Sequence, residues 1–193
     1  MSLKTLFDEF NQSVSEIRDV INDNLAFHTH LAKTEEWSQI CSALDTLDDT
    51  ALAMDAYWSV QFDPDAQNNG SAYLFIYGLL QAMCLQQNAI MSLAKCFDLT
   101  IKVANEYPFM AQVREHRDWA VGHPVTNSHG PHTLSRPNLH RDSFELVSNN
   151  SKVTLRQRIG TESICSGQFR EGKQALQRIK TAVAQKREGW SVS

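Results

Sequence analysis

Arg117, Asp118 and His123 are the residues whose types and spacing best suit a chemical role. Arg117 falls on the apolar stripe of an expected helix, among Met110, Val113, Ala120 and Val121. Burying an unpaired guanidinium is costly, so Arg117 must meet an anion, a partner subunit or a water-filled groove. Gly122 can end the helix and turn His123 back toward Arg117, while Asp118 can orient either of them. Arg117 can bind an anion, and an imidazole such as that of His123 can take or give a proton near neutral pH.

The segment from Arg117 to Pro124, RDWAVGHP, carries a family resemblance. It resembles the Arg-polar-(four to six residues)-His signature of HEPN-domain proteins, the higher eukaryotes and prokaryotes nucleotide-binding family. By helix order the resemblance covers residues 1–125, and it departs from the common pattern at Asp118, where Asn is frequent. It implies an up-and-down bundle of four to five helices and a homodimer in which Arg117 and His123 of both protomers line one cleft. It also implies a metal-independent endoribonuclease, in a toxin–antitoxin or defence setting, with an antitoxin or other protein as a possible partner.

Such an enzyme uses the 2′-hydroxyl of RNA as its nucleophile and leaves a 2′,3′-cyclic phosphate. His123 could take or give the proton, because an unperturbed imidazole has a pKa near 6.5, and general acid–base help is worth about 10²–10⁴-fold. Arg117 would hold the phosphate with two hydrogen bonds and stabilise the transition state. We expect no cofactor and no metal, in line with a sequence that lacks an HExxH motif.

A second interpretation of the same residues stays open. Arg117 could pair with an acid among residues 1–60, and His123 could cap a helix. The chain would then be a non-catalytic helical interaction module, or a nucleotide- or RNA-binding module, which docks a protein partner.

Other basic and histidine residues lie just before the motif and after it. Six of the basic residues in this part of the chain are predicted to bind RNA phosphates: Arg114, Arg136, Arg141, Lys152, Arg156 and Arg158. A solvated face is the alternative explanation for such charges. Four histidines, His123, His129, His132 and His140, lie within 18 positions, but their spacing matches no familiar ligand set, so no metal site is expected. His116 could support the site or could equally lie on the surface.

Hydrophobic periodicity predicts the elements that position these residues. Apolar residues recur at helical spacing over residues 3–25, 34–59, 72–97, 108–121 and 164–187. Alternating residues at 144–147 and 152–156 predict a β-hairpin, and 124–142 is expected to be a surface loop. Gly167 and Gly172 are expected to weaken the first half of the last helix. The prediction is a mainly α fold, one domain of residues 1–193, in which a loop and hairpin at 124–160 precede the C-terminal helix.

Composition and charge narrow the class of protein. A chain of 193 residues, 42% of them hydrophobic, suits one globular domain with its own core. The sequence lacks a signal-peptide core and an apolar stretch of roughly 20 residues, so a cytoplasmic address with no membrane contact is expected. Cys41, Cys84, Cys96 and Cys165 form no CxxC pair and suit reduced core thiols. The formal net charge is −4, yet residues 112–193 hold 13 basic and 7 acidic side chains, so the motif lies in the positive part.

Overall fold

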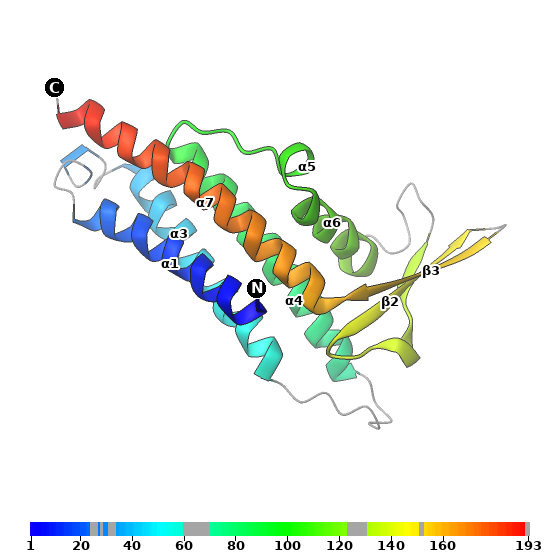
Figure 1. Ribbon diagram of the computed structural model, residues 1–193. Helices are drawn as coiled ribbons and strands as arrows, with labels where there is room; N and C mark the ends of the chain where they lie inside the picture. Colours follow the sequence, from blue (N-terminus) through cyan, green and yellow to red (C-terminus); the bar gives the residue numbers. More distant parts are fainter. Residues whose placement is uncertain are drawn as a thin grey trace.

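Four long helices form the body of the protein in the computed structural model, which describes residues 1–23, 27, 29–30, 34–59, 70–122, 131–150 and 153–191. They are α1 (Leu3–Asn22), α3 (Glu35–Ser59), α4 (Gly70–Cys96) and α7 (Thr161–Ser191). The shorter helices α5 (Val103–Glu106) and α6 (Pro108–Arg117) follow α4, and α6 packs on α4 and α7 (Figure 1). The predicted mainly α fold with a small β element before the last helix is confirmed.

The helices predicted from apolar periodicity are all present, with ends that differ by a few residues. Their apolar faces meet in one core, which includes Phe10, Leu47, Leu80 and Phe169. After Arg117 the last expected turn of α6 is a π-helical turn, η1 (Asp118–Gly122). None of the described helices is both long and apolar enough to cross a membrane. The four cysteines lie in helices as free thiols, and all except the half-buried Cys41 are buried.

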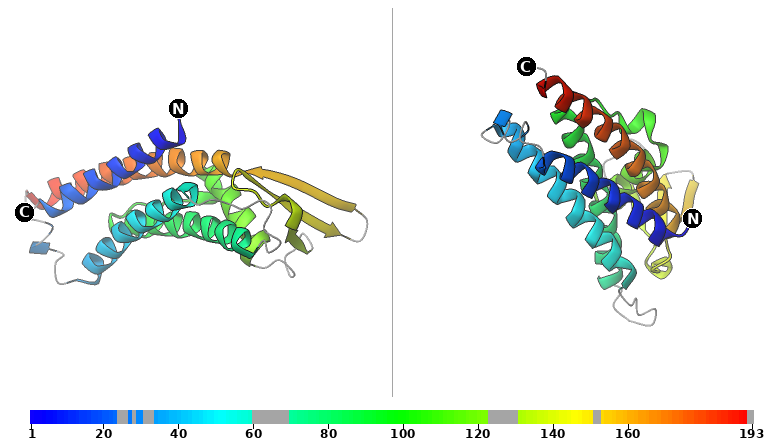
Figure 2. Two further views of the ribbon diagram at one scale, coloured as in Figure 1. Left: turned by 90° about the horizontal axis from the view of Figure 1, so that it is seen from below. Right: turned by 60° about the vertical axis from the view of Figure 1, so that its left-hand side comes forward.

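A three-stranded antiparallel sheet lies at the end of the bundle where α7 begins (Figures 1 and 2). Strands β2 (Ser143–Asn150) and β3 (Val153–Gly160) form the predicted hairpin, with Phe144 opposite Ile159. Strand β1 (His132–Leu134) and a 3₁₀ turn, η2 (Arg136–Asn138), lie where a surface loop was predicted, so that prediction is wrong there. Three residues are too few to reveal the strand alternation, although His132 and Leu134 are both buried.

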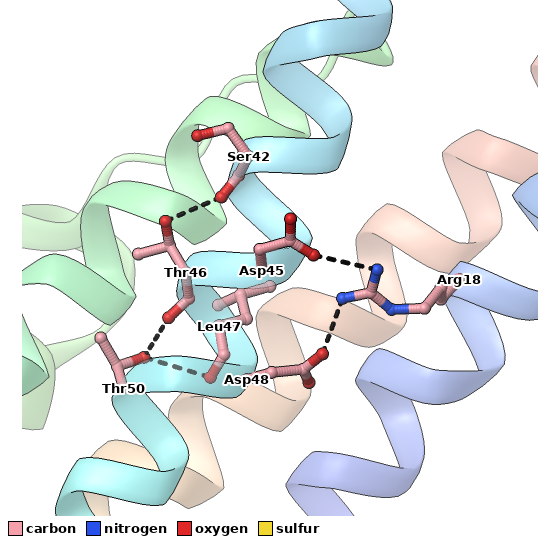
Figure 3. Close-up of polar contacts among 7 residues, drawn as sticks. All are labelled: Arg18, Ser42, Asp45, Thr46, Leu47, Asp48 and Thr50. Carbon is pink, nitrogen blue, oxygen red and sulfur yellow. Dashed lines mark hydrogen bonds and ion pairs between the residues drawn. The ribbon is translucent and has the colours of Figure 1, made fainter.

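Ion pairs join the acidic first helices to basic residues elsewhere. Lys173 and Lys180 of α7 bond to Glu9 and Glu16 of α1, at 2.9 and 2.6 Å. Arg18 of α1 bonds to two acids of α3: Nη1 to Asp45 at 3.2 Å and Nη2 to Asp48 at 2.6 Å (Figure 3). The two lysine pairs therefore join the acidic first part of the chain to the basic second part, and the Arg18 pairs join α1 to α3 within the first part.

Two glycines of α7 allow other elements to approach closely. A Cβ on Gly172 would lie 2.8 Å from the ring of Phe10, and a Cβ on Gly167 would lie 2.6 Å from the ring of Phe109. Helix α7 nevertheless continues through both positions. The expected weakening of this part of the helix is therefore offset by contacts with α1 and α6 that only glycine permits.

We expect Gly172→Ala to lower the free energy of unfolding by about 1–3 kcal/mol, because the added methyl group must displace the Phe10 ring. Gly78→Ala in α4 is the matched control. Its Cβ meets no atom within 4 Å, so the substitution should raise the stability by up to about 1 kcal/mol through helix propensity. Urea unfolding of the two variants measures both changes. Equal stability of the two alanine variants would contradict the close packing at Gly172.

Candidate functional site

Arg117 is held in a defined position at the edge between α6 and α4. Its Nε donates to Oε1 of Gln81 at 3.1 Å, and its Nη1 donates to Oδ1 of Asp118 at 2.7 Å. The side chain is still 32% exposed, and Nη2 has no partner among the described residues. The guanidinium is therefore oriented by the protein while part of it remains open to a ligand.

Arg114 lies one turn before Arg117 and also contacts α4. Its Nε donates to Oε1 of Gln87 and its Nη2 to Oδ1 of Asn88, both at 2.6 Å. These partners are neutral amides, so they orient the guanidinium without neutralising its charge. By contrast, Arg156 pairs with Glu145 and Arg178 with Glu106. Arg114 thus adds positive potential beside Arg117.

A buried amide network fixes the partner of Arg114. Gln86, Gln87 and Gln168 are fully buried where α4, α6 and α7 meet. Nε2 of Gln87 donates to Met110 O at 3.0 Å and to Oε1 of Gln168 at 2.8 Å, which leaves its Oε1 facing Arg114. Nε2 of Gln168 donates to Oε1 of Gln86 at 2.9 Å. The position of Arg114 is therefore coupled to the packing of three helices.

A carboxylate from α7 caps the N-terminus of α6. Glu171 is 6% exposed, and its two oxygens accept from the backbone N–H groups of Phe109 and Met110 at 3.1 and 2.8 Å. These N–H groups lack partners within the helix, and a negative charge at this position also interacts favourably with the positive N-terminal end of the helix dipole. Glu171 thereby fixes the start of α6 against α7.

Asp118 is the second predicted catalytic residue, and it begins the π-helical turn. Its side chain is 54% exposed and bonds to Arg117. All acids of residues 1–60 are among the described residues, and the carboxylate that Arg117 contacts is that of Asp118, not one of these. The alternative pairing of Arg117 with the acidic first part of the chain is therefore not found. His123, the third predicted residue, lies outside the described residues.

His116 lies inside the protein, so its interpretation as a surface residue is wrong. It is 1% exposed, and neither ring nitrogen has a hydrogen-bond partner among the described residues. Burial lowers the pKa of His116 from 6.5 to about 4, because the charged form would lose its hydration. The imidazole is therefore neutral at pH 7 and lies on the buried face of α6, next to Arg117 in the chain.

An aromatic stack joins the π-helical turn to the sheet. The rings of Trp119 and His132 lie parallel, with centroids 4.5 Å apart and an interplanar angle of 11°. Tyr73 of α4 also donates its hydroxyl to Leu134 O in the same strand, at 3.3 Å. His132 is thus a packing residue of β1, His140 is exposed, and His123 and His129 lie outside the described residues.

The other predicted RNA-binding residues form a second group, at the sheet. Arg156 Nη1 bonds to Glu145 at 2.9 Å, and Arg158 Nη2 bonds to Ser143 at 2.9 Å. Arg136 and Arg141 are exposed in η2 and in the segment before β2, and Lys152 lies outside the described residues. Of the five predicted residues that the structure describes, Arg114 is the one that lies beside Arg117, one turn earlier on α6.

Sequence reasoning missed the amides that hold the two arginines: Gln81, Gln87, Asn88 and Gln168. A signal was present, because Gln86, Gln87 and Asn88 form a polar run in a helix that is otherwise apolar on nearly every side. Polar residues in such a helix need partners when they are buried.

Comparisons of the chain with protein-family models, with curated proteins and with solved structures give no match. The geometry around Arg117 therefore carries the argument for function.

The burial of His116 predicts how stability depends on pH. Because the pKa is about 4 in the folded protein and near 6.5 in the unfolded chain, only the unfolded chain gains this proton as the pH falls from 6.5 to 4. We expect stability to decrease by about 3 kcal/mol over this interval through His116 alone. His116→Leu should remove that part of the pH dependence, and His140→Leu, at an exposed position, should retain it. Unfolding midpoints in urea between pH 4 and 7 measure the effect, and identical slopes for both variants would refute it.

Proposed function

We propose that this protein is a metal-independent endoribonuclease of the HEPN type, which cleaves RNA by attack of the 2′-hydroxyl on the adjacent phosphorus. One observation carries the proposal. Arg117 is anchored through Nε and Nη1, is 32% exposed, and has Nη2 open among the described residues. A guanidinium held in this way can bind a phosphate without reorganising, which is the property that transition-state stabilisation requires.

The two arginines would supply the charge that the transition state needs. Arg117 would donate to the non-bridging oxygens of the scissile phosphate, where negative charge increases as the 2′-oxygen adds. Arg114 would strengthen the attraction from one helical turn away, since its own partners are the neutral side chains of Gln87 and Asn88. Asp118 would act as a positioning residue, because its carboxylate is already bonded to Arg117.

His123 would transfer the protons. The 2′-hydroxyl must lose a proton as the new P–O bond forms, and the 5′-oxygen must gain one as its bond to phosphorus breaks. His123 follows directly after the π-helical turn that starts beside Arg117, which supports its role near the same phosphate. A homodimer would supply a second imidazole, so that one His123 acts as base and the other as acid. A cytoplasmic toxin or defence setting, with an antitoxin or another protein as partner, is part of the same proposal and follows from the resemblance alone.

The direct test incubates the purified protein with RNA in EDTA. We expect fragments with 2′,3′-cyclic phosphate ends, and we expect His123→Ala and Arg117→Ala each to reduce the cleavage rate at least about 10²-fold. Arg170→Ala, at an exposed position of α7, is the control for loss of one arginine. Uncut RNA, or equal cleavage by wild type and His123→Ala, would leave the non-catalytic binding module as the better hypothesis.

Gln81 provides a second test, of the orientation of Arg117. Gln81→Leu removes the acceptor of Nε but keeps a side chain of similar size, so kcat should fall about tenfold with little change in KM. Gln177→Leu, at an exposed position of α7, is the matched control. Unfolding curves should show that both variants are as stable as wild type. A change in KM alone, or the same kcat as wild type, would count against an orienting role for Gln81.

A further inference from the structure

An open groove of about 830 Å³ runs along the outer side of α5 and α6. Aromatic and small apolar residues form much of its wall, with polar side chains between them. Its principal side chains are Phe109, Gln112, Glu115, Asp118 and Trp119. No lysine or arginine lines it among the described residues, and two carboxylates do. The groove therefore disfavours a free phosphate and suits an uncharged ring that carries hydrogen-bond donors.

The rings of Phe109 and Trp119 each pack against another residue of the protein. The ring of Phe109 lies against Gly167, where a Cβ would be 2.6 Å away, yet Phe109 remains 38% exposed. The ring of Trp119 is stacked on His132 at 4.5 Å, and Trp119 also lines the groove. Rings that are already fixed lose little conformational entropy when a flat ligand stacks on them. Stacking of a nucleobase on such a ring is worth about 1–3 kcal/mol.

The polar side chains lie between the two rings. Gln112 and Glu115 are three residues apart on α6 and so share one face of that helix, and Trp119, in the π-helical turn that follows, lines the same groove. The Glu115 carboxylate can accept two parallel N–H bonds, and the Gln112 amide can donate to a carbonyl oxygen. This set is complementary to the Watson–Crick edge of guanine, which offers N1–H, an N2 amino group and the O6 acceptor.

The groove is also adjacent to the arginine site. Asp118 lines the groove, and its Oδ1 lies 2.7 Å from Nη1 of Arg117. A phosphate at Arg117 and a base in the groove would therefore lie on two sides of one carboxylate, as parts of one bound strand.

We propose that this groove binds a guanine base of the RNA beside the phosphate held by Arg117, an inference that rests on the proposed ribonuclease function. Other bases fit less well. Adenine and cytosine offer one amino group next to an acceptor, and uracil offers one N–H between two acceptors, so the Glu115 carboxylate would face an acceptor in each case. The substrate class is thus single-stranded RNA with an accessible guanine, whose Watson–Crick edge is free.

The test titrates the full-length protein with guanosine, adenosine, cytidine and uridine and follows the indole N–H signal of Trp119 by NMR. Trp119→Phe identifies that signal. Guanosine should shift it and bind about tenfold more tightly than the other nucleosides, and Glu115→Gln should reduce guanosine affinity about tenfold. Glu188→Gln, at an exposed position near the end of α7, removes the same charge outside the groove and should bind guanosine like wild type.

Nucleosides have no phosphate, so this measurement does not depend on catalysis. Equal affinity for all four nucleosides, or unchanged guanosine affinity in Glu115→Gln, overturns the guanine site whatever the RNA assay shows. RNA cleavage without a preference for phosphates next to guanine also overturns it and leaves the ribonuclease proposal intact. Guanosine selectivity that depends on Glu115, without RNA cleavage, supports the base site and overturns the ribonuclease.

Discussion

The burial of three glutamine side chains where α4, α6 and α7 meet is the constraint on which the site depends. A buried amide that lacks partners costs about 1–3 kcal/mol, so a helix register that pairs these groups is favoured, and Nε2 of Gln86 is the one amide nitrogen of the three without a partner among the described residues. Gln87 uses its two N–H groups on Met110 O and on Gln168, and only its oxygen remains for Arg114. A shift of α6 by one residue would break the two of these bonds that join α6 to α4, those of Gln87 with Met110 O and with Arg114. Core packing thus determines where Arg114 lies and, one turn later, where Arg117 lies.

Helix α6 needs this support because it has only ten residues. Isolated helices shorter than about 12–15 residues are marginal in water. Glu171 of α7 fixes its first turn through Phe109 and Met110, and the stack of Trp119 on His132 fixes the turn that follows its last residue. The arginines lie between these two anchors. The sheet therefore has a structural part in the site, since β1 supplies the ring that holds the π-helical turn.

The sequence was sufficient to predict the helices because their apolar faces recur every three or four residues over twenty or more positions in the long helices. The sequence also singled out Arg117 as a charge that needs a partner, but the expected place of Arg117 on the apolar stripe was wrong. The buried residues of α6 are Met110, Val113 and His116, and Arg117 lies beside them, 32% exposed. The partners were not predictable. Gln81 lies 36 residues before Arg117, and Gln168 lies 81 residues after Gln87, so these pairs exist only once the helices have packed. Strand β1 was missed because its three residues are too short for periodicity to act as a signal.

Several basic side chains of the positive part of the chain are paired with carboxylates in the structure. Residues 112–193 carry a basic excess, but Lys173 and Lys180 are paired with α1, and Arg156 is paired with Glu145. The hydrogen-bond partner of a basic side chain therefore determines whether its positive charge remains available to a ligand. A carboxylate neutralises an arginine, whereas an amide only orients it.

Asp118 illustrates the balance between these two effects. The charge-assisted hydrogen bond from Arg117 to Asp118, at 2.7 Å, holds the guanidinium more firmly than a bond to an amide would. The negative charge of the Asp118 carboxylate, however, repels an incoming phosphate. An asparagine at this position would keep the hydrogen bond and remove the repulsion. The neighbouring Arg114 offsets the repulsion, because Gln87 and Asn88 leave its charge uncompensated. The triad of Arg114, Arg117 and Asp118 therefore carries a net charge of about +1, with the positive groups fixed by α4 and the negative group exposed. If the protein binds RNA as proposed, that arrangement would favour a strand that places its phosphate on the arginine side and its base on the carboxylate side.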